Sequence, residues 1–475
     1  MPGPHLNICT FCSLGCDVRL EPAAHADLVR QEYVAGGRFG GRLCAKGNYI
    51  ADLVNHPGRL DEPRIEGDRT PLGEVLARVG EAMREREKVA LVLSGDASVE
   101  EGTLAARFSA EALAPERFAV AFPTGDGKVA RALAACGAPA ASPDDLAEAD
   151  CVVAVGRPFE VGPVAAGAVL NARHSERGCV LASIAEGDTL FGRFADERLG
   201  GTVRHGLVEL VGALGARKGP PDWARDIAKA AKKAKTEADP KCARRIAAAL
   251  KGADRPVFLL ATGDPLAAGL ASAACVLAGK GASLLALSSY PNARELAELS
   301  TASVPDVIKA AREGRVTSLI CLGVDLIEGY PHAGVAEALG RLEMLVVGAA
   351  FESEFTRRAN VVLPVALAVE RDGTFLGHRH EAAARPPGGA AGYGEILKTI
   401  AAAMGVTLGP AENEPGTTGG EATVEPFGDA AGLIEEALSA EPPAVVMSTA
   451  VDHAERSLTR MVRLGAELVR YAEIG

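Results

Sequence analysis

The sequence predicts an α/β protein in which a small cysteine-containing N-terminal domain precedes two open α/β units with mostly parallel sheets. Three observations predict this class. Short apolar runs alternate with helical patterns from residue 70 to about residue 405. The hydrophobic fraction is 48%, enough for a large core, whereas aromatic residues make up only 4%. Four of the ten cysteines lie within the first 65 residues, which contain few long apolar runs.

These patterns divide the 475 residues into five expected segments. They are a cysteine-containing domain at 1–65, a first α/β unit at 66–215, a charged helical connection at 216–253, a second α/β unit at 254–405, and a linker with a helical tail at 406–475.

In the first unit, the apolar runs VALVLS, CVVAVG and CVLAS predict buried strands at 89–94, 151–156 and 179–183. Helical patterns follow the first two of these strands, at about 98–113 and 163–174. Because strands alternate with helices, we expect a parallel sheet with right-handed crossovers.

The second unit repeats this alternation. Its apolar runs predict strands at 256–263, 283–288, 318–325 and 344–350. Its helical patterns lie at about 265–279, 304–313 and 333–340. The segment 360–380 predicts one more strand, followed by a hairpin-like loop.

Two further segments differ from this rhythm. Residues 217–253 are rich in Ala, Lys and Arg, which predicts helices with a solvated, charged face. Residues 408–428 are rich in Pro, Gly, Glu and Thr, which indicates a linker or loop. The tail then shows a helical pattern, a short strand VVMS, and an amphipathic helix from about residue 452 that we expect to pack on this chain or on a partner.

Charge and hydropathy exclude some classes of function. The net charge of −12 disfavours a nucleic-acid partner. No apolar run reaches the roughly 18 residues that would span a bilayer. The N-terminal residues show neither a Sec signal nor a twin-arginine pair, so we expect a cytoplasmic protein. Cysteines in that compartment stay reduced, which favours metal binding over disulfides.

Four cysteines have the spacing of cluster ligands. Three stand close together, separated by two and then three residues, and the fourth follows after 27 more; they are Cys9, Cys12, Cys16 and Cys44. A short loop can turn three thiolates toward the corners of a [4Fe–4S] cubane, and a separate turn supplies the fourth. Gly15 and Gly47 suit such a tight backbone. Zinc sites usually show two paired motifs, so the spacing favours an iron–sulfur cluster, with zinc and no metal as alternatives.

The other six cysteines stand alone in apolar strand or helix patterns. We expect them to be buried, inert thiols. They are Cys136, Cys151, Cys179, Cys242, Cys275 and Cys321.

The motifs ICTFCSLGC, RLCAKGNY and HPGRLDEPRI resemble the cluster-binding domain of the molybdopterin oxidoreductase family. That family includes formate dehydrogenases, periplasmic nitrate reductases, formylmethanofuran dehydrogenases and the large electron-transfer subunit of complex I. Further similar stretches lie at 145–164, 318–331 and 352–380, so the resemblance covers roughly residues 5–405. It implies that the two α/β units are of the molybdopterin oxidoreductase type.

The resemblance also implies positions that bind cofactor. The family places a lysine after the fourth cysteine, between cluster and pterin, and contacts its nucleotide from Gly-rich turns and acidic residues at strand ends. The matching positions are Lys46, Gly156, Gly263, Asp264, Gly323, Asp325 and His378. Structural alternatives exist for each kind of residue: a solvated lysine, a turn that permits close strand–helix packing, and a carboxylate that caps a helix.

This sequence departs from the family in two places. Active members usually carry a Cys, selenocysteine or Ser that approaches molybdenum or tungsten after the second strand. The matching stretch, 118–133, has neither Cys nor His; Thr124 is its nearest hydroxyl and Asp126 its nearest carboxylate, while Cys136 comes too late. Active members also commonly carry a C-terminal domain of about 120 residues over the pterin pair, and we expect that this chain lacks it.

We therefore expect an iron–sulfur electron-transfer subunit of a multi-subunit cytoplasmic redox complex, which relays single electrons through one [4Fe–4S] cluster. Its partners would carry flavin or further clusters. The alternative is an active molybdenum or tungsten bis-pterin oxidoreductase of formate or a formyl group, with His378 and His380 as acid–base groups. A third hypothesis makes the cluster purely structural. Molybdopterin guanine dinucleotide is allowed by the resemblance but not expected, and no catalytic residue is assigned.

Overall fold

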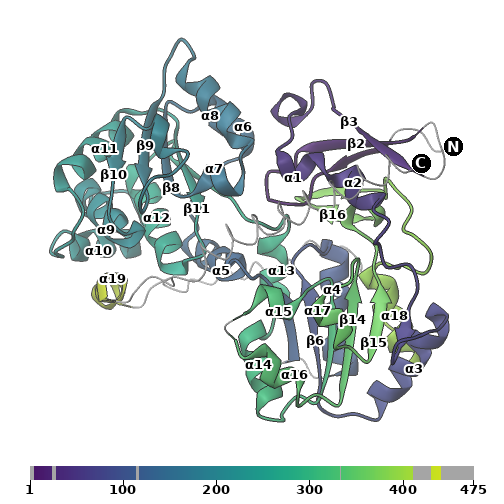
Figure 1. The fold of residues 1–475 in the computed structure, drawn as a ribbon. Helices are drawn as coiled ribbons and strands as arrows, with labels where there is room; N and C mark the ends of the chain where they lie inside the picture. Colours follow the sequence, from purple (N-terminus) through teal and green to yellow (C-terminus); the bar gives the residue numbers. More distant parts are fainter. Residues whose placement is uncertain (1–4, 24–27, 114–116, 332, 410–428, 440–475) are drawn as a thin grey trace.

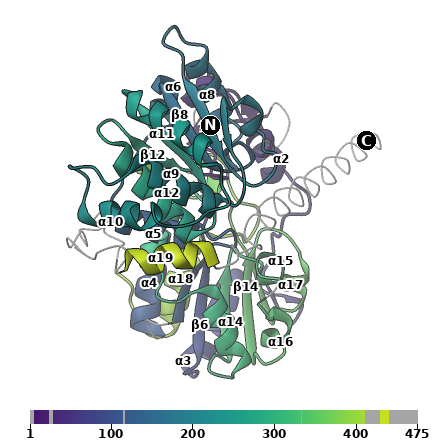
Figure 2. The same cartoon turned by 90° about the vertical axis from the view of Figure 1, so that its left-hand side faces the viewer.

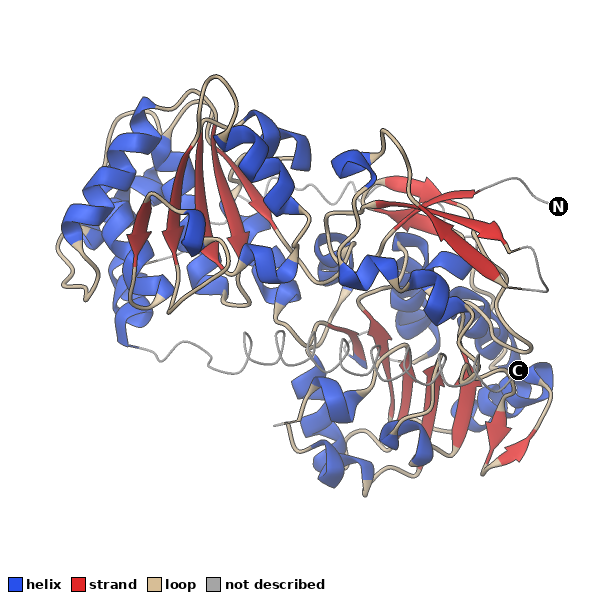
Figure 3. Ribbon diagram, turned by 45° about the horizontal axis from the view of Figure 1, so that its top comes forward, coloured by secondary structure: helices blue, strands red, loops and turns tan. Residues whose placement is uncertain are grey.

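The computed structural model describes residues 5–23, 28–113, 117–331, 333–409 and 429–439. Figure 1 shows a small N-terminal domain beside two larger α/β lobes. We call these the five-strand lobe and the seven-strand lobe, after their sheets. Figure 3 shows the sheets of the N-terminal domain and of the two lobes as separate sets of strands. This architecture confirms the predicted α/β class.

The N-terminal domain has a three-stranded antiparallel sheet in the order β1-β2-β3. Its strands and short helices are β1 (His5–Ile8), β2 (Asp17–Pro22), β3 (Val29–Glu32), η1 (Arg38–Gly41), α1 (Ala45–Asn48) and α2 (Ile50–Val54). Few of these residues form a core of their own. Leu14, Val18 and Leu20 instead belong to a buried cluster shared with the five-strand lobe.

The five-strand lobe has an all-parallel sheet in the order β10-β9-β8-β11-β12. Its strands are β8 (Cys151–Gly156), β9 (Val180–Ile184), β10 (Glu197–Leu199), β11 (Pro256–Ala261) and β12 (Ser283–Ala286). Its helices are α6 (Pro143–Glu148), α7 (Pro158–Val161), α8 (Ala165–Arg173), η3 (Gly192–Phe194), α9 (Val203–Leu214), α10 (Asp222–Ala231), α11 (Pro240–Gly252) and α12 (Pro265–Ala278).

The seven-strand lobe has the order β5-β4-β15-β14-β13-β6-β7, parallel except at the β15–β4 and β4–β5 pairs. Its strands are β4 (Arg64–Ile65), β5 (Asp68–Arg69), β6 (Val89–Ser94), β7 (Phe118–Ala121), β13 (Ser318–Leu322), β14 (Met344–Ala349) and β15 (Val361–Pro364). Its helices are α3 (Leu72–Arg84), α4 (Val99–Ala112), α14 (Val304–Arg312), α15 (Leu326–Gly329), α16 (Val335–Leu339), α17 (Glu354–Arg357) and α18 (Tyr393–Ala403).

Two helices join the lobes, α5 (Asp126–Cys136) and α13 (Ala293–Leu299). α5 packs against α12 of the five-strand lobe and against α13, while α13 also packs against α4 of the seven-strand lobe. Figure 1 shows both helices where the lobes meet. A hairpin, β16 (Gly373–Phe375) and β17 (His378–His380), follows η4 (Ala368–Glu370).

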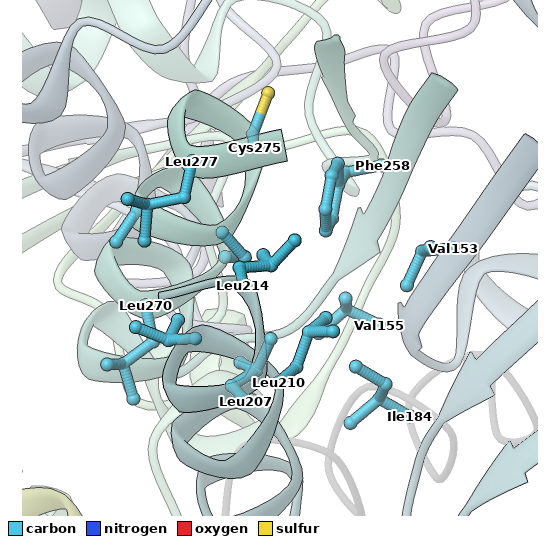
Figure 4. Close-up of a cluster of buried hydrophobic side chains, with 14 of the residues drawn as sticks. Val153, Val155, Ile184, Leu207, Leu210, Leu214, Phe258, Leu270, Cys275 and Leu277 are labelled. Carbon is cyan, nitrogen blue, oxygen red and sulfur yellow. The ribbon is translucent and has the colours of Figure 1, made fainter. Parts of the chain in front are cut away.

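The core of the five-strand lobe explains why its strands read as continuous apolar runs. Val153 and Val155 of β8 face Leu207, Leu210 and other leucines of α9 and α12 (Figure 4). The alternate residues of the same strand pack against α7, α8 and the N-terminal domain. Because both faces of the sheet are covered, every residue of β8 is buried.

The expected division into units at 66–215 and 254–405 does not match the sheets. β6 and β7 come from the expected first unit, but they pair into one sheet with β13, β14 and β15 from the expected second unit. Likewise, β8 pairs with β11. The alternation of strands and helices is visible in the sequence, but strand order is set by packing between distant segments.

The expected charged connection at 216–253 is also part of a lobe. Its helices α10 and α11 carry high charge on one face, yet Ile227 and Ile246 are fully buried in the core of the five-strand lobe. The alanines beside them let the helices approach α9 closely.

The tail is described only at α19 (Ala430–Ser439), which agrees with the predicted helical pattern there. Figure 2 shows α19 beside α10, and it also contacts α9 and α12. The predicted linker at 408–428, the strand VVMS and the helix from residue 452 lie almost wholly outside the described residues. In the described part of the chain, no helix is both long and apolar enough to cross a membrane.

Candidate metal centre

Three of the four predicted ligands lie on one hairpin loop. Cys9 directly follows β1, Cys16 directly precedes β2, and Cys12 lies in the turn between them. The backbone N–H of Cys9 donates a 2.8 Å hydrogen bond to the carbonyl of Cys16, which closes the loop. Cys44 comes from a separate turn, at the start of α1. The chain therefore has the local geometry predicted from the spacing.

The four thiols interact electrostatically inside the protein. Burial raises the pKa of Cys9 well above its usual value, and the neighbouring Cys12, Cys16 and Cys44 raise it further. The pKa of Cys16 rises to about 12, first because of burial and then because of Cys12 and Cys44. Buried thiolates this close together need cationic charge between them, which is what iron or another metal supplies. The donor set thus fits a four-cysteine cluster.

A zinc ion and a [4Fe–4S] cluster require different arrangements of their four cysteine ligands. Among the described residues, no three His, Cys, Asp or Glu side chains converge on a point that could hold a single metal ion. Tetrahedral zinc needs all four sulfurs about 2.3 Å from one ion. In a [4Fe–4S] cubane each thiolate binds a different iron, so the sulfurs stand further apart. Whether the four cysteines bind a [4Fe–4S] cluster or zinc therefore stays a prediction.

The cysteine loop is fixed to the five-strand lobe by a residue that the sequence analysis did not identify. The Ser13 N–H donates to the carbonyl of Ser288 at 2.9 Å, and the Ser288 N–H donates to Ser13 Oγ at 2.9 Å. Ser288 lies just beyond the end of β12. No local pattern marks Ser13, because its partner is 275 residues away in the chain.

Two further contacts hold the loop from the other side. The Arg38 guanidinium donates to the carbonyl of Leu14 at 3.2 Å. The backbone N–H of Arg38 donates to Asp17 Oδ2 at 2.6 Å. Gly15 has a positive φ of 57°, and a Cβ there would lie 2.4 Å from the side chain of Leu376. Glycine is required at this position both for the backbone conformation and for the close approach.

The positive charge of Lys46 acts on two titratable side chains, Cys12 and Asp126. Its ammonium lowers the pKa of both the Cys12 thiol and the Asp126 carboxyl, although burial raises both pKa values overall. The side chain is half-buried, so it is not simply a solvated lysine. A role in binding a cofactor stays a prediction.

The stretch 118–133, which the resemblance matches to the metal-ligand loop of active family members, carries Thr124 and Asp126. Asp126 is 6% exposed and begins α5; it accepts hydrogen bonds from the Thr124 hydroxyl and from Ser289 N. Burial raises its pKa to about 6, against the hydrogen bonds and Lys46, which lower it. Cys136 is at the far end of α5, about 15 Å along the helix by its rise per residue.

Three predicted cofactor-binding positions lie together at the carboxyl edge of the five-strand sheet, after the adjacent strands β8 and β11. Gly156 has φ of 78°, and a Cβ there would lie 2.1 Å from Ala261 O, so this glycine permits close packing of the strand ends. Gly263 is buried beside it. Asp264 caps α12 by accepting from Leu266 N at 3.0 Å, and it pairs with Arg204. Asp264 therefore has a role as a helix cap and Gly156 has a role in close packing. A contact between these residues and a nucleotide remains a prediction.

We expect Asp264→Ala to destabilise the protein by about 3 kcal/mol, because it removes the carboxylate partner of the buried Arg204 together with a helix cap. The two side chains are only 6% and 10% exposed. The measurement is the free energy of unfolding in urea. Glu313→Ala, which breaks the exposed pair with Arg315, is the matched control and should cost less than about 1 kcal/mol. Equal costs for the two variants would contradict the assignment.

The other two strand-end positions, Gly323 and Asp325, lie in the seven-strand lobe, so the predicted positions do not form one site. A Cβ at Gly323 would lie 1.8 Å from the Tyr393 hydroxyl. Asp325 Oδ1 caps α15 through Ile327 N, at 2.9 Å, and Glu328 N, at 3.1 Å. A cavity of about 250 Å³ beside them is lined by Asp96 and Tyr393, among other residues.

The two histidines lie on β17, which packs against β1 of the N-terminal domain. His378 is exposed and His380 is half-buried. Burial lowers the pKa of His380, and the charges of His378 and Arg38 lower it further. The hairpin thus packs against both the N-terminal domain and α4, and both proposed histidine roles stay predictions.

Five of the six remaining cysteines are buried, as predicted: Cys136, Cys151, Cys242, Cys275 and Cys321. Cys179 is the exception, because it lies half-buried just before β9.

No protein-family model matches the chain. Local sequence similarity links it to several curated proteins. It is 35% identical over 78 residues to a nitrate reductase of Klebsiella oxytoca and 36% identical over 70 residues to the alpha subunit of an NADPH-Fe(3+) oxidoreductase of Geobacter sulfurreducens. It is 33% identical over 139 residues to one of the subunits of the NADH-quinone oxidoreductase of Pseudomonas putida. These matches cover 16%, 14% and 28% of this chain and 9%, 8% and 15% of those proteins.

Solved structures extend the likeness to most of the chain. Acetylene hydratase from Pelobacter acetylenicus matches with a TM-score of 0.67 at 13% identity, over 85% of this chain and 69% of that one. A chain of the formyltransferase/hydrolase complex from Methylorubrum extorquens, determined with methylofuran, matches with a TM-score of 0.51 at 16% identity, over 72% of this chain and 98% of that one. At these identities the likeness shows a shared fold.

Proposed function

Because this chain has the molybdopterin oxidoreductase fold and local sequence similarity to oxidoreductase subunits, we propose that it is an iron–sulfur electron-transfer subunit of a multi-subunit redox complex. The observation that carries the proposal is that the buried Cys9, Cys12 and Cys16 share one hairpin loop, and that the half-buried Cys44 is near enough to influence the thiol of Cys9. A [4Fe–4S] cluster bound there would supply one-electron transfer.

The chain's own residues are arranged to hold such a group in place. Ser13 ties the cysteine loop to the end of β12, and Arg38 ties it to Leu14 and Asp17. These contacts restrain the loop that carries Cys9, Cys12 and Cys16. A fixed ligand geometry keeps the reorganisation of the site small when its charge changes. Lys46 adds a positive charge on the side that faces α5.

The loop at the start of α5 supports electron transfer without substrate chemistry. Where active family members present a thiol or selenol, this chain presents the Asp126 carboxyl, which accepts hydrogen bonds from Thr124 and Ser289. Neither Cys nor His occurs between Phe118 and Leu133. The proposal therefore assigns substrate turnover to other subunits, which would carry flavin or further clusters in the cytoplasm.

The test is to count iron, molybdenum and tungsten in the native complex purified without oxygen, and to titrate the reduction of the chain. We expect about four iron atoms per copy of this chain after subtraction of partner clusters, one-electron reduction, and neither molybdenum nor tungsten. Stoichiometric molybdenum or tungsten that stays with this chain would overturn the proposal in favour of a bis-pterin oxidoreductase of formate or a formyl group.

A second candidate function rests on one structural relative. The match to this chain extends over 98% of a chain from a formyltransferase/hydrolase complex. On this candidate the chain is a subunit of a formyl-handling complex. Co-purification with a formyltransferase subunit would favour this candidate, whereas co-purification with flavin-containing subunits alone would favour the first.

A further inference from the structure

A cavity that no part of the proposed function uses lies at the joint between the two lobes. We call it the Asp126 cavity. Its volume is about 560 Å³, within the range of pockets that bind small organic molecules. α5 forms one wall and the end of β12 forms another, with α13 at the rim. Ser13 of the cysteine loop also lines it.

The walls of the cavity are mostly apolar. α5 contributes Val129, Ala130 and Leu133, and β12 contributes Leu284 and Leu285. The small side chains of α5 leave room that larger residues would fill. A ligand that fits these walls must have an apolar body, because a polar one would lose its hydrogen bonds to water without replacement.

Three charged residues line the cavity: the Asp126 carboxylate is more than nine-tenths buried, whereas Arg294 and Glu295 of α13 are exposed. The Asp126 carboxylate accepts hydrogen bonds from Thr124, Ser288 and Ser289. An ionised carboxylate offers about four lone-pair positions, so room remains for one more donor. A buried carboxylate favours a cation or a hydrogen-bond donor and repels an anion.

From this combination we propose that the Asp126 cavity binds an organic cation with an apolar body, of the class of primary aromatic or alkyl amines. The ammonium group donates to the Asp126 carboxylate, and the hydrocarbon part lies along Ala130 and Leu133 of α5. This class is opposite in charge to formate. The inference goes beyond electron transfer and stands whether or not the cysteines bind a cluster.

Three matched probes test the proposal: benzylamine, benzyl alcohol and benzoate, titrated into the full-length purified protein at pH 7.5 and followed by ligand-observed NMR. The three share one ring and differ in the charge of the head group. We expect benzylamine to bind at least about tenfold more tightly than benzyl alcohol, and benzoate most weakly. An equal or reversed order, or no binding of benzylamine at millimolar concentration, would overturn the proposal.

Variants locate the binding. Asp126→Asn should reduce the affinity for benzylamine to that for benzyl alcohol. Ala130→Trp should fill the cavity and abolish binding of both. The matched control is Ala135→Trp, on the same helix but exposed and outside the cavity lining, which should leave binding unchanged. Benzylamine binding that survives Ala130→Trp would place the ligand elsewhere and refute the site. Iron content is counted on the same samples, so failure of the cluster proposal is recognised separately.

Discussion

Cys12→Ser should remove almost all of the about four iron atoms expected per chain, because a four-cysteine cluster depends on each of its thiolates. Cys12 is 7% exposed and lies in the turn between Cys9 and Cys16, so no water or outer residue can easily take its place. The N-terminal domain has little core of its own and shares its apolar residues with the five-strand lobe. We therefore also expect faster proteolysis within residues 5–60. The measurements are iron content, visible absorption and limited proteolysis.

Cys179→Ser provides the control. This thiol is half-buried in the five-strand lobe, outside the cysteine loop, and its replacement should leave iron and absorption unchanged. Full iron content in Cys12→Ser, or equal losses in both variants, would show that the four-cysteine site has been assigned wrongly. Stoichiometric zinc in the wild-type protein, with no iron, would revive the zinc alternative.

Arg371→Ala should lower the free energy of unfolding by about 4 kcal/mol, because it leaves two carboxylates without their buried cation. The Arg371 side chain is 3% exposed and pairs with Glu101 of α4 and with Asp96, at 3.5 Å from the latter. Its guanidinium also lies 4.1 Å from the centre of the Tyr393 ring. Burial makes each of these contacts stronger than its surface equivalent. Urea denaturation measures the loss.

The conservative replacement separates charge from geometry. Arg371→Lys keeps the charge but loses the planar fork and the stacking on Tyr393, so it should recover less than half of the lost stability. Arg379→Ala is the matched control from the same hairpin region. Its pair with Glu100 is exposed on the arginine side, and its loss should cost less than about 1 kcal/mol. A cost for Arg371→Ala as small as that of the control would refute the argument.

The residues on either side of Arg371 connect distant parts of the chain. The stretch 370–374 lies within 352–380, one of the segments whose sequence resembles the family. In the structure, Glu370 pairs with the buried Arg59 at 2.8 Å, which links the N-terminal domain to this loop. A Cβ at Gly373 would lie 2.3 Å from Ser98 Cβ, so the loop passes directly against α4. The stretch therefore joins three parts of the chain, a role that its spacing did not reveal.

Local patterns predicted the individual elements well. The strand at 89–94 and the strand at 151–156 have the bounds predicted from their apolar runs. The helix expected at 265–279 ends one residue earlier, at Ala278. These predictions succeed because periodicity and apolar runs depend on residues that are neighbours in the chain. The cysteine loop is equally local, since the Cys9–Cys16 hydrogen bond spans only eight residues.

The sequence by itself thus determined the α/β class, most elements and the four candidate ligands. Only the tertiary structure decided that β6 pairs with β13 and β8 with β11, that Asp264 faces Arg204, and that Ser13 is tied to Ser288. It also decided that Asp126 lines a cavity between lobes. The physical reason is the same in each case. These contacts join residues far apart in the chain, and their free energy comes from burial and pairing that exist only once the lobes have packed together.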